Sequence, residues 1–170
     1  MTIDYKLLTM SSHECVLILD NIRSAYNTGS MFRTADAAGV SSIVLTGYTP
    51  APIEKSRERP DIAKVALGAE KSVPWKVVPT VTEAIEELKN LGYAICILER
   101  DAKAMSLFEY KPTTKFALVV GNEVEGVPPE VIQMADAILE IPMNGMKESL
   151  NVSVAAGVAL YQLLQARSSH

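Results

Sequence analysis

The chain has 170 residues, 48% of them hydrophobic, and 16 Lys and Arg against 20 Asp and Glu give a net charge of −4. This length predicts a single domain, residues 1–170, with an adequate core. Two cysteines exclude a disulfide scaffold and favour a cytoplasmic location. No apolar run approaches the ~20 residues of a membrane helix and no signal peptide is visible, so we expect no membrane contact. The acidic balance argues against coating nucleic acid by bulk charge but permits a local basic site.

Short apolar runs alternate with helical patterns along the chain. In chain order we expect a strand over 16–19, a helix over 27–39, a strand over 42–46, an exposed loop or short helix over 55–64, a strand over 76–78, a helix over 80–91, strands over 93–98 and 116–120, a helix over 129–135, a strand over 137–141 and a helix over 149–167. We expect Asn27 and Ser149 to be N-caps. This alternation predicts an α/β fold, a mostly parallel sheet with helices on both faces.

The loops that follow strands are the first places to search, because ligands of open parallel sheets bind at the carboxyl ends of the strands. The first such loop, residues 20–29, leads into a helix on which Arg33 lies one turn beyond Gly29. An arginine there suits a phosphate or a developing oxyanion. An ordinary helix cap followed by a solvated arginine explains the segment equally well.

A second loop, residues 121–129 (GNEVEGVPP), directly follows a buried strand. Its two glycines have the spacing of a phosphate-binding loop, but Val127 and Pro128 stand where that motif needs Lys and Ser or Thr. No GxGxxG follows any strand, so a dinucleotide fingerprint is absent too. Free backbone amides and the Glu123 carboxylate remain as candidate ligand groups; the alternative is a plain strand–turn–helix connection.

A third loop, residues 141–151 (IPMNGMKESLN), precedes the last helix. Its apolar lining suits a flat ligand. In the helix an apolar stripe falls at helical spacing, which packing in the core explains completely. This stripe comprises Val154, Gly157, Val158, Tyr161 and Leu164. Small residues at 155–157 would let a partner helix approach closely.

Several other chemistries are excluded by the residues available. The two histidines, His13 and His170, lie near the termini, so a Ser-His-Asp or Cys-His site has no plausible base. Cysteines and histidines together lack zinc-ligand spacing, and we expect no metal. Cys96 lies within an apolar strand and is expected to be a packed, inert thiol.

Taken together, the three loops resemble the ordered motifs of the SpoU/TrmH branch of SPOUT RNA methyltransferases. The resemblance rests on Asn27 with Arg33, then GNEVEG, then IPM followed by SLNVSVAAGVAL, and it covers the chain from Cys15 onward. It implies transfer of a methyl group from S-adenosyl-L-methionine to a ribose 2′-hydroxyl of RNA. It also implies a C-terminal trefoil knot and an obligate homodimer whose active site combines loops of both subunits.

The resemblance also assigns residues. Cofactor binding falls to Gly121, Ile141 and Leu150, with Met143 in the same loop and Leu98 as a weaker match. Catalysis falls to Arg33, with Asn27, Glu123, Ser149 and Asn151 beside it. Arginine essentially never deprotonates in proteins, so we expect Arg33 to clamp an RNA phosphate and stabilise alkoxide charge rather than act as a base. Glu123 would orient Arg33 or assist departure of the proton.

The chain departs from the family in two respects. Asn122 stands where many relatives have a small residue, which is expected to change the local hydrogen bonding. No separate RNA-recognition domain is visible, so the catalytic dimer itself must grip RNA. Phosphate contacts are expected from a basic set that a solvated charged surface explains equally well. This set comprises Arg23, Lys55, Arg57, Arg59, Lys64 and Lys71.

The substrate stays open at this point. Transfer RNA is favoured because a minimal catalytic dimer can suffice for it, and ribosomal RNA is the alternative. A different class is a non-catalytic module that binds RNA or a nucleotide, although such a module need not keep Arg33, Glu123, Ser149 and Asn151 together.

Overall fold

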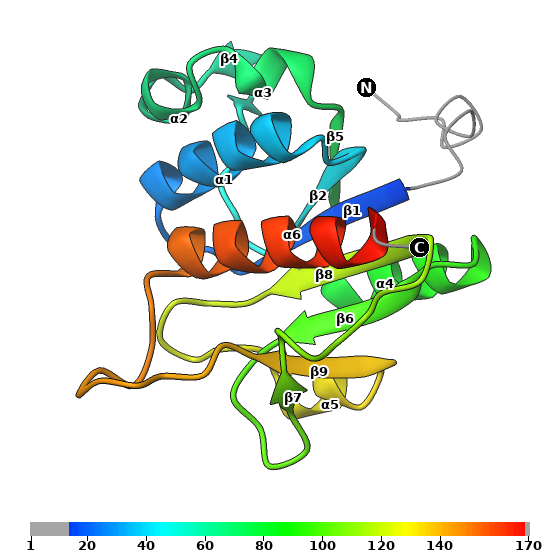
Figure 1. The fold of residues 1–170 in the computed structure, drawn as a ribbon. Coiled ribbons are helices and arrows are strands. Elements are labelled where there is room, and N and C mark those ends of the chain that lie inside the picture. Colours follow the sequence, from blue (N-terminus) through cyan, green and yellow to red (C-terminus); the bar gives the residue numbers. More distant parts are fainter. Residues whose placement is uncertain (1–13, 169–170) are drawn as a thin grey trace.

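The computed structural model describes residues 14–168, which form a seven-stranded sheet in the order β5-β2-β1-β8-β6-β9-β7 (Figure 1). Every pairing in this sheet is parallel. Its strands are β1 (Glu14–Asp20), β2 (Ser42–Thr46), β5 (Trp75–Val78), β6 (Ala94–Leu98), β7 (Met105–Ser106), β8 (Lys115–Val120) and β9 (Ala137–Glu140). The helices are α1 (Ala25–Ala38), α2 (Pro60–Ala66), α3 (Ala69–Ser72), α4 (Val81–Asn90), α5 (Pro129–Ile132) and α6 (Val152–Ser168).

The sheet is covered on both faces, because alternate residues of each strand point to opposite sides. On β1, Leu17 and Leu19 belong to one buried core together with Phe32 of α1 and Leu160 of α6. The intervening β1 residues belong to a second core that contains side chains of α4 and α5. The continuous apolar runs of β1 and β8 are therefore explained by burial on both sides. The predicted α/β class, with its mostly parallel sheet and two helical layers, is confirmed.

Two predicted helix caps are wrong. The side chain of Ser24, not Asn27, caps α1 by accepting a hydrogen bond from the Asn27 backbone N–H at 3.1 Å. Asn151, not Ser149, caps α6, since its Oδ1 accepts from the Ser153 backbone N–H at 2.9 Å. These shifts place Asn27 within the first turn of α1 and leave its amide free for another contact. The predicted end of α1 at Gly39 is confirmed, with φ of 74°.

The segment predicted as a loop or short helix, residues 55–64, overlaps an antiparallel hairpin, β3 (Ile53–Glu54) and β4 (Arg57–Glu58), and the beginning of α2. Both turn residues of the hairpin, Lys55 and Ser56, have positive φ. The short strand β7 and helix α3 were not predicted either. Among residues 14–168 no helix is long and apolar enough to span a bilayer. The C-terminal knot stays a prediction.

Candidate active site

A pocket of about 330 Å³ lies at the carboxyl ends of β6, β8 and β9. It is lined by residues that follow these three strands and by the segment that leads into α6. All five predicted cofactor residues line it, namely Leu98, Gly121, Ile141, Met143 and Leu150. Three predicted catalytic residues, Glu123, Ser149 and Asn151, line the same pocket. The structure thus brings together two of the loops that sequence reasoning singled out.

Glu123 connects this pocket to the loop after β1. Its Oε2 accepts the Arg23 backbone N–H at 3.0 Å, and its Oε1 accepts the Ser24 backbone N–H at 3.3 Å. Oε1 also accepts from the Asn27 side-chain amide at 2.9 Å. The carboxylate therefore satisfies donors at the beginning of α1, where a negative charge is also favoured by the helix dipole.

Asn27 continues the chain of hydrogen bonds into α6. Its Oδ1 accepts from the Asn151 side-chain amide at 3.2 Å, while its own amide donates to Glu123. Asn27 is buried. Three of the predicted catalytic residues, Glu123, Asn27 and Asn151, form one hydrogen-bonded line that joins the loop after β8 to the first turn of α1 and to the cap of α6. A fourth, Ser149, lies in the pocket wall without joining this line.

The hydrogen bonds outweigh burial in setting the acidity of Glu123. Burial raises its pKa, but donation from the Arg23 backbone, the Asn27 amide and the Ser24 backbone lowers it, and the net pKa is below the ordinary value. A carboxylate with a lowered pKa is a weak proton acceptor at neutral pH. Glu123 is therefore suited to hold the first turn of α1 in place rather than to remove a proton.

Arg33 lies apart from this cluster. Its side chain is exposed on α1, does not line the pocket, and makes no hydrogen bond or ion pair with residues 14–168. The proposed contact between Arg33 and Glu123 is absent, because the Glu123 carboxylate is occupied by donors from Arg23, Ser24 and Asn27. The guanidinium is consequently free to bind an anion.

Asn122, which was expected only to change the local hydrogen bonding, makes hydrogen bonds to three different loops. Its Oδ1 accepts the Val124 and Glu125 backbone N–H groups, both at 2.8 Å, which closes a turn around Glu123. Its Nδ2 donates to the Asn21 backbone oxygen at 2.9 Å and to the Tyr48 hydroxyl at 2.7 Å. A single buried side chain therefore ties together the loops after β8, β1 and β2.

Sequence reasoning missed Glu99 and Arg100, which follow β6 and line the pocket. The Glu99 carboxylate accepts the Val127 backbone N–H at 2.9 Å, and the Arg100 guanidinium donates to the Glu148 backbone oxygen at 3.0 Å. They brace the loop after β8 and the loop before α6 respectively. The signal was available, since both residues directly follow a predicted buried strand.

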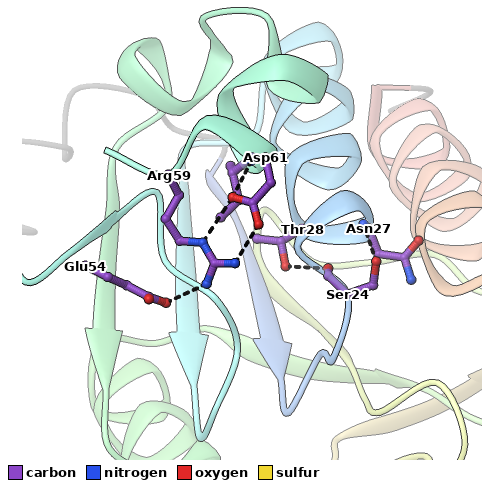
Figure 2. Close-up of polar contacts among 7 residues, drawn as sticks. Ser24, Asn27, Thr28, Glu54, Arg59 and Asp61 are labelled. Carbon is purple, nitrogen blue, oxygen red and sulfur yellow. Dashed lines mark hydrogen bonds and ion pairs between the residues drawn. The ribbon is translucent and has the colours of Figure 1, made fainter. Parts of the chain in front are cut away.

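The predicted RNA-binding residues differ in how free they are. Arg59 is held by Glu54 at 3.0 Å and Asp61 at 2.6 Å, and Figure 2 shows its guanidinium between the two carboxylates. Lys71 pairs with Glu58 at 3.3 Å. The remaining predicted side chains are exposed and form no ion pair within the described part of the chain. These are Arg23, Lys55, Arg57 and Lys64.

The two cysteines, Cys15 and Cys96, do not line the pocket. Cys96 is buried, so its predicted packing in the core is confirmed, and burial raises its pKa to about 11, which favours the unreactive thiol form. Both histidines fall outside the described residues. Within residues 14–168 no three His, Cys, Asp or Glu side chains are grouped closely enough to hold a metal ion.

Comparisons with known proteins give this site a family. The family model described as the SpoU rRNA Methylase family matches residues 14–161. The chain belongs to this family. It is 33% identical over 162 residues to the tRNA (guanosine(18)-2′-O)-methyltransferase of Aquifex aeolicus, covering 95% of this chain and 74% of that protein. It is 35% identical to the 23S rRNA (guanosine-2′-O-)-methyltransferase RlmB of Pasteurella multocida, covering 95% of this chain but only 64% of that protein.

Solved structures of other methyltransferases share the fold. An AdoMet-bound rRNA methyltransferase from Sinorhizobium meliloti superposes with a TM-score of 0.81 at 28% identity, covering 89% of this chain and 56% of that chain. A structure titled for 2-OH methylation of C/U34 on tRNA has a TM-score of 0.78 at 27% identity, and the match covers 94% of this chain and 100% of that chain.

Proposed function

We propose that this protein is an S-adenosyl-L-methionine-dependent RNA methyltransferase that acts on a ribose 2′-hydroxyl. The observation that carries the proposal is the pocket at the carboxyl ends of β6, β8 and β9, joined by Glu123, Asn27 and Asn151 to the helix that bears Arg33. Relatives that match most of this chain are named for guanosine 2′-O-methylation of tRNA and 23S rRNA.

The residues present fit the cofactor. A volume of about 330 Å³ lies within the ordinary range for small-ligand pockets. Apolar walls from Leu98, Ile141 and Leu150 suit an adenine ring, and lining carboxylates, Glu99 among them, suit a ligand with a sulfonium and an ammonium charge. When bound, the cofactor supplies an electrophilic methyl group.

Turnover requires the hydroxyl oxygen to attack the methyl carbon in line, while the carbon–sulfur bond breaks and its electron pair stays on sulfur. The hydroxyl proton is released to solvent water in the same process. Glu123 is a weak acceptor for it, because hydrogen bonds lower its pKa. The chain's contribution is therefore orientation, through the rigid line of Glu123, Asn27 and Asn151, and stabilisation of developing negative charge by Arg33.

We infer that Arg33 acts in a homodimer. It is exposed and lies outside its own chain's pocket lining, so a second subunit offers a way to bring it to a pocket. Part of the apolar stripe predicted on the last helix supports this inference. Val158 and Leu164 pack against the core, but Val154 and Tyr161 are 51% and 54% exposed. An uncovered apolar helix face favours a partner helix.

We propose tRNA as the substrate, with rRNA as the alternative. A structure titled for tRNA methylation is covered along its whole length by this chain, whereas the chain spans less than two thirds of the RlmB relative. Residues 1–170 form a single catalytic domain in this proposal, located in the cytoplasm. Phosphate contacts come from Arg23, Lys55, Arg57 and Lys64, whose side chains are free of ion pairs in the described structure.

Labelled methyl transfer tests the function. The purified protein is incubated with S-adenosyl-L-methionine and with separate tRNA and rRNA fractions, and the modified nucleotide is mapped by digestion and mass spectrometry. We expect a 2′-O-methylated nucleotide in the tRNA fraction; product in the rRNA fraction alone would support the alternative. Calorimetric titration with the cofactor separates an enzyme from a non-catalytic module, which would show no binding at millimolar cofactor.

A further inference from the structure

Tyr48 is an aromatic side chain held at one end and exposed over its surface. It follows β2, and the residue is 58% exposed. Its hydroxyl accepts the Asn122 amide at 2.7 Å, and its backbone N–H donates to Asn21 Oδ1 at 3.3 Å. The hydroxyl and the backbone are therefore both anchored, while much of the side chain faces solvent.

The backbone around Tyr48 is built to hold it there. Asn21 has φ of 52°, a left-handed conformation that a non-glycine residue adopts only at a cost, and Gly47 has φ of 62°. A Cβ on Gly47 would overlap the Asn21 side-chain oxygen. The loops after β1 and β2 thus pack closely against each other at Gly47, and this packing fixes the position of the next residue, Tyr48.

Tyr48 is also coupled to the active site. The same Asn122 side chain that donates to its hydroxyl accepts two backbone N–H groups of the loop that carries Glu123. The ring consequently lies at the edge of the loop that lines the cofactor pocket, but it is not itself part of the pocket lining. More than half of the residue's surface is exposed to solvent, next to the loop that borders the pocket.

The approaching molecule, on the proposed function, is RNA, whose distinctive apolar surfaces are its unstacked bases. Aromatic side chains that bind single-stranded RNA stack on such bases with little dependence on sequence. A ring that is already fixed loses little conformational entropy on binding. We propose that Tyr48 is a stacking platform for a base of the RNA substrate beside the catalytic pocket, an inference that rests on the proposed function.

The test compares Tyr48→Leu with Tyr48→Phe, because Phe keeps the ring and loses only the hydroxyl. Affinity is measured for a short oligoadenylate, for polyphosphate, which has negative charge and no bases, and for S-adenosyl-L-methionine by calorimetry. Phe108→Leu is the matched control: Phe108 is also exposed but follows β7, at the opposite edge of the sheet.

Tyr48→Leu is expected to weaken oligoadenylate binding about fivefold or more, the loss of one stacked base. It is expected to leave polyphosphate and cofactor affinity unchanged. Phe108→Leu should bind oligoadenylate like the wild type, and Tyr48→Phe, which keeps the ring but loses the anchoring hydroxyl, should lose less affinity than Tyr48→Leu. Wild-type affinity in Tyr48→Leu, an equal loss of polyphosphate affinity, or no binding of oligoadenylate by the wild-type protein would overturn the proposal. So would loss of cofactor affinity in both Tyr48 variants, which would mean that the ring only supports the Asn122 loop.

Failure of the proposed function is distinguishable from failure of this inference. If the wild-type protein transfers no methyl group to either RNA fraction but Tyr48→Leu still loses base-dependent binding, the stacking role stands and the enzyme assignment falls. If methyl transfer occurs and Tyr48→Leu has the wild-type KM for RNA, the stacking role falls alone.

Discussion

At the scale of single residues, the charge of Arg33 and the geometry of its guanidinium are separable. Arg33→Lys keeps the charge but loses the planar set of donors that suits a phosphate or alkoxide. We expect turnover at saturating cofactor to fall about 100-fold, the size of effect seen when one donor to a developing oxyanion is removed. Affinity for S-adenosyl-L-methionine, measured by calorimetry, should not change, since Arg33 does not line the pocket. A loss of cofactor affinity with unchanged turnover would contradict this role.

Asp20, the last residue of β1, allows a prediction of how the stability of the protein depends on pH. Burial raises its pKa above the ordinary value, against hydrogen bonds that include one from the Thr46 hydroxyl at 2.7 Å. Between the ordinary pKa of the unfolded chain and the raised pKa of the folded protein, Asp20 is protonated in the folded state and ionised in the unfolded state. The free energy of unfolding therefore falls as pH rises through this range. The variant Asp20→Asn keeps an oxygen that can accept the hydrogen bond from the Thr46 hydroxyl, but its amide does not titrate.

The stability of Asp20→Asn relative to wild type should accordingly increase with pH, from about pH 4 upward, the range that begins at the ordinary pKa of an aspartate. Urea denaturation at a series of pH values measures the difference directly. Any destabilisation by the new amide group is the same at every pH, so the test depends only on how the difference in the free energy of unfolding changes with pH. A difference independent of pH would show that Asp20 does not titrate differently in the folded state.

At the scale of elements, Gly29 determines how closely α1 approaches α2. A Cβ at this position would lie 2.7 Å from the Ile62 backbone oxygen, too close for a carbon atom. Helix propensity alone favours Ala over Gly by about 1 kcal/mol, so the two effects have opposite signs. We expect Gly29→Ala to destabilise the protein by about 1–3 kcal/mol, the ordinary cost of overpacking, in chemical denaturation. An increase in stability would mean that α2 moves away freely.

The elements that could be predicted are those with a strong local pattern. The buried strands β1, β2, β6 and β8 follow from continuous apolar runs, and α4 is capped by Thr80, the first residue of the helix expected over 80–91. The β3–β4 hairpin escaped prediction because Lys55 and Ser56 occupy positive φ, where Gly or Asn is the usual signal. Strand β7 has two residues and pairs only with the distant β9, so no local pattern marks it.

The sequence allowed us to predict which residues belong to the candidate site, but not which of them contact one another. Strand ends identified the loops, and the family resemblance selected residues within them. The cap of α1 could not be decided locally, because Ser24 and Asn27 are both good capping residues; the decision comes from Glu123, which binds the Asn27 amide from 96 residues away. The same tertiary contact explains why Glu123 does not meet Arg33.

At the scale of the whole molecule, the exposed apolar residues of α6, Val154 and Tyr161, mark the proposed dimer interface. Val154→Glu places a charge on this face without entering either core, since Val154 is exposed. If the face forms the dimer interface, the variant should be a folded monomer by light scattering and circular dichroism. The monomeric variant should also lose methyl-transfer activity, because its Arg33 has no pocket of a second subunit to reach. A folded Val154→Glu dimer would move the interface elsewhere.

Sharing of sites between subunits can be tested without disturbing the interface. Arg33→Ala and Glu123→Ala are each expected to be inactive alone. Co-expressed with two different tags and purified through both, they form a heterodimer. If Arg33 serves the partner's pocket, one of its two sites carries both defects and the other carries none, so about half of the wild-type activity should return. If Arg33 serves its own pocket, each site keeps one defect and the heterodimer stays as inactive as either parent.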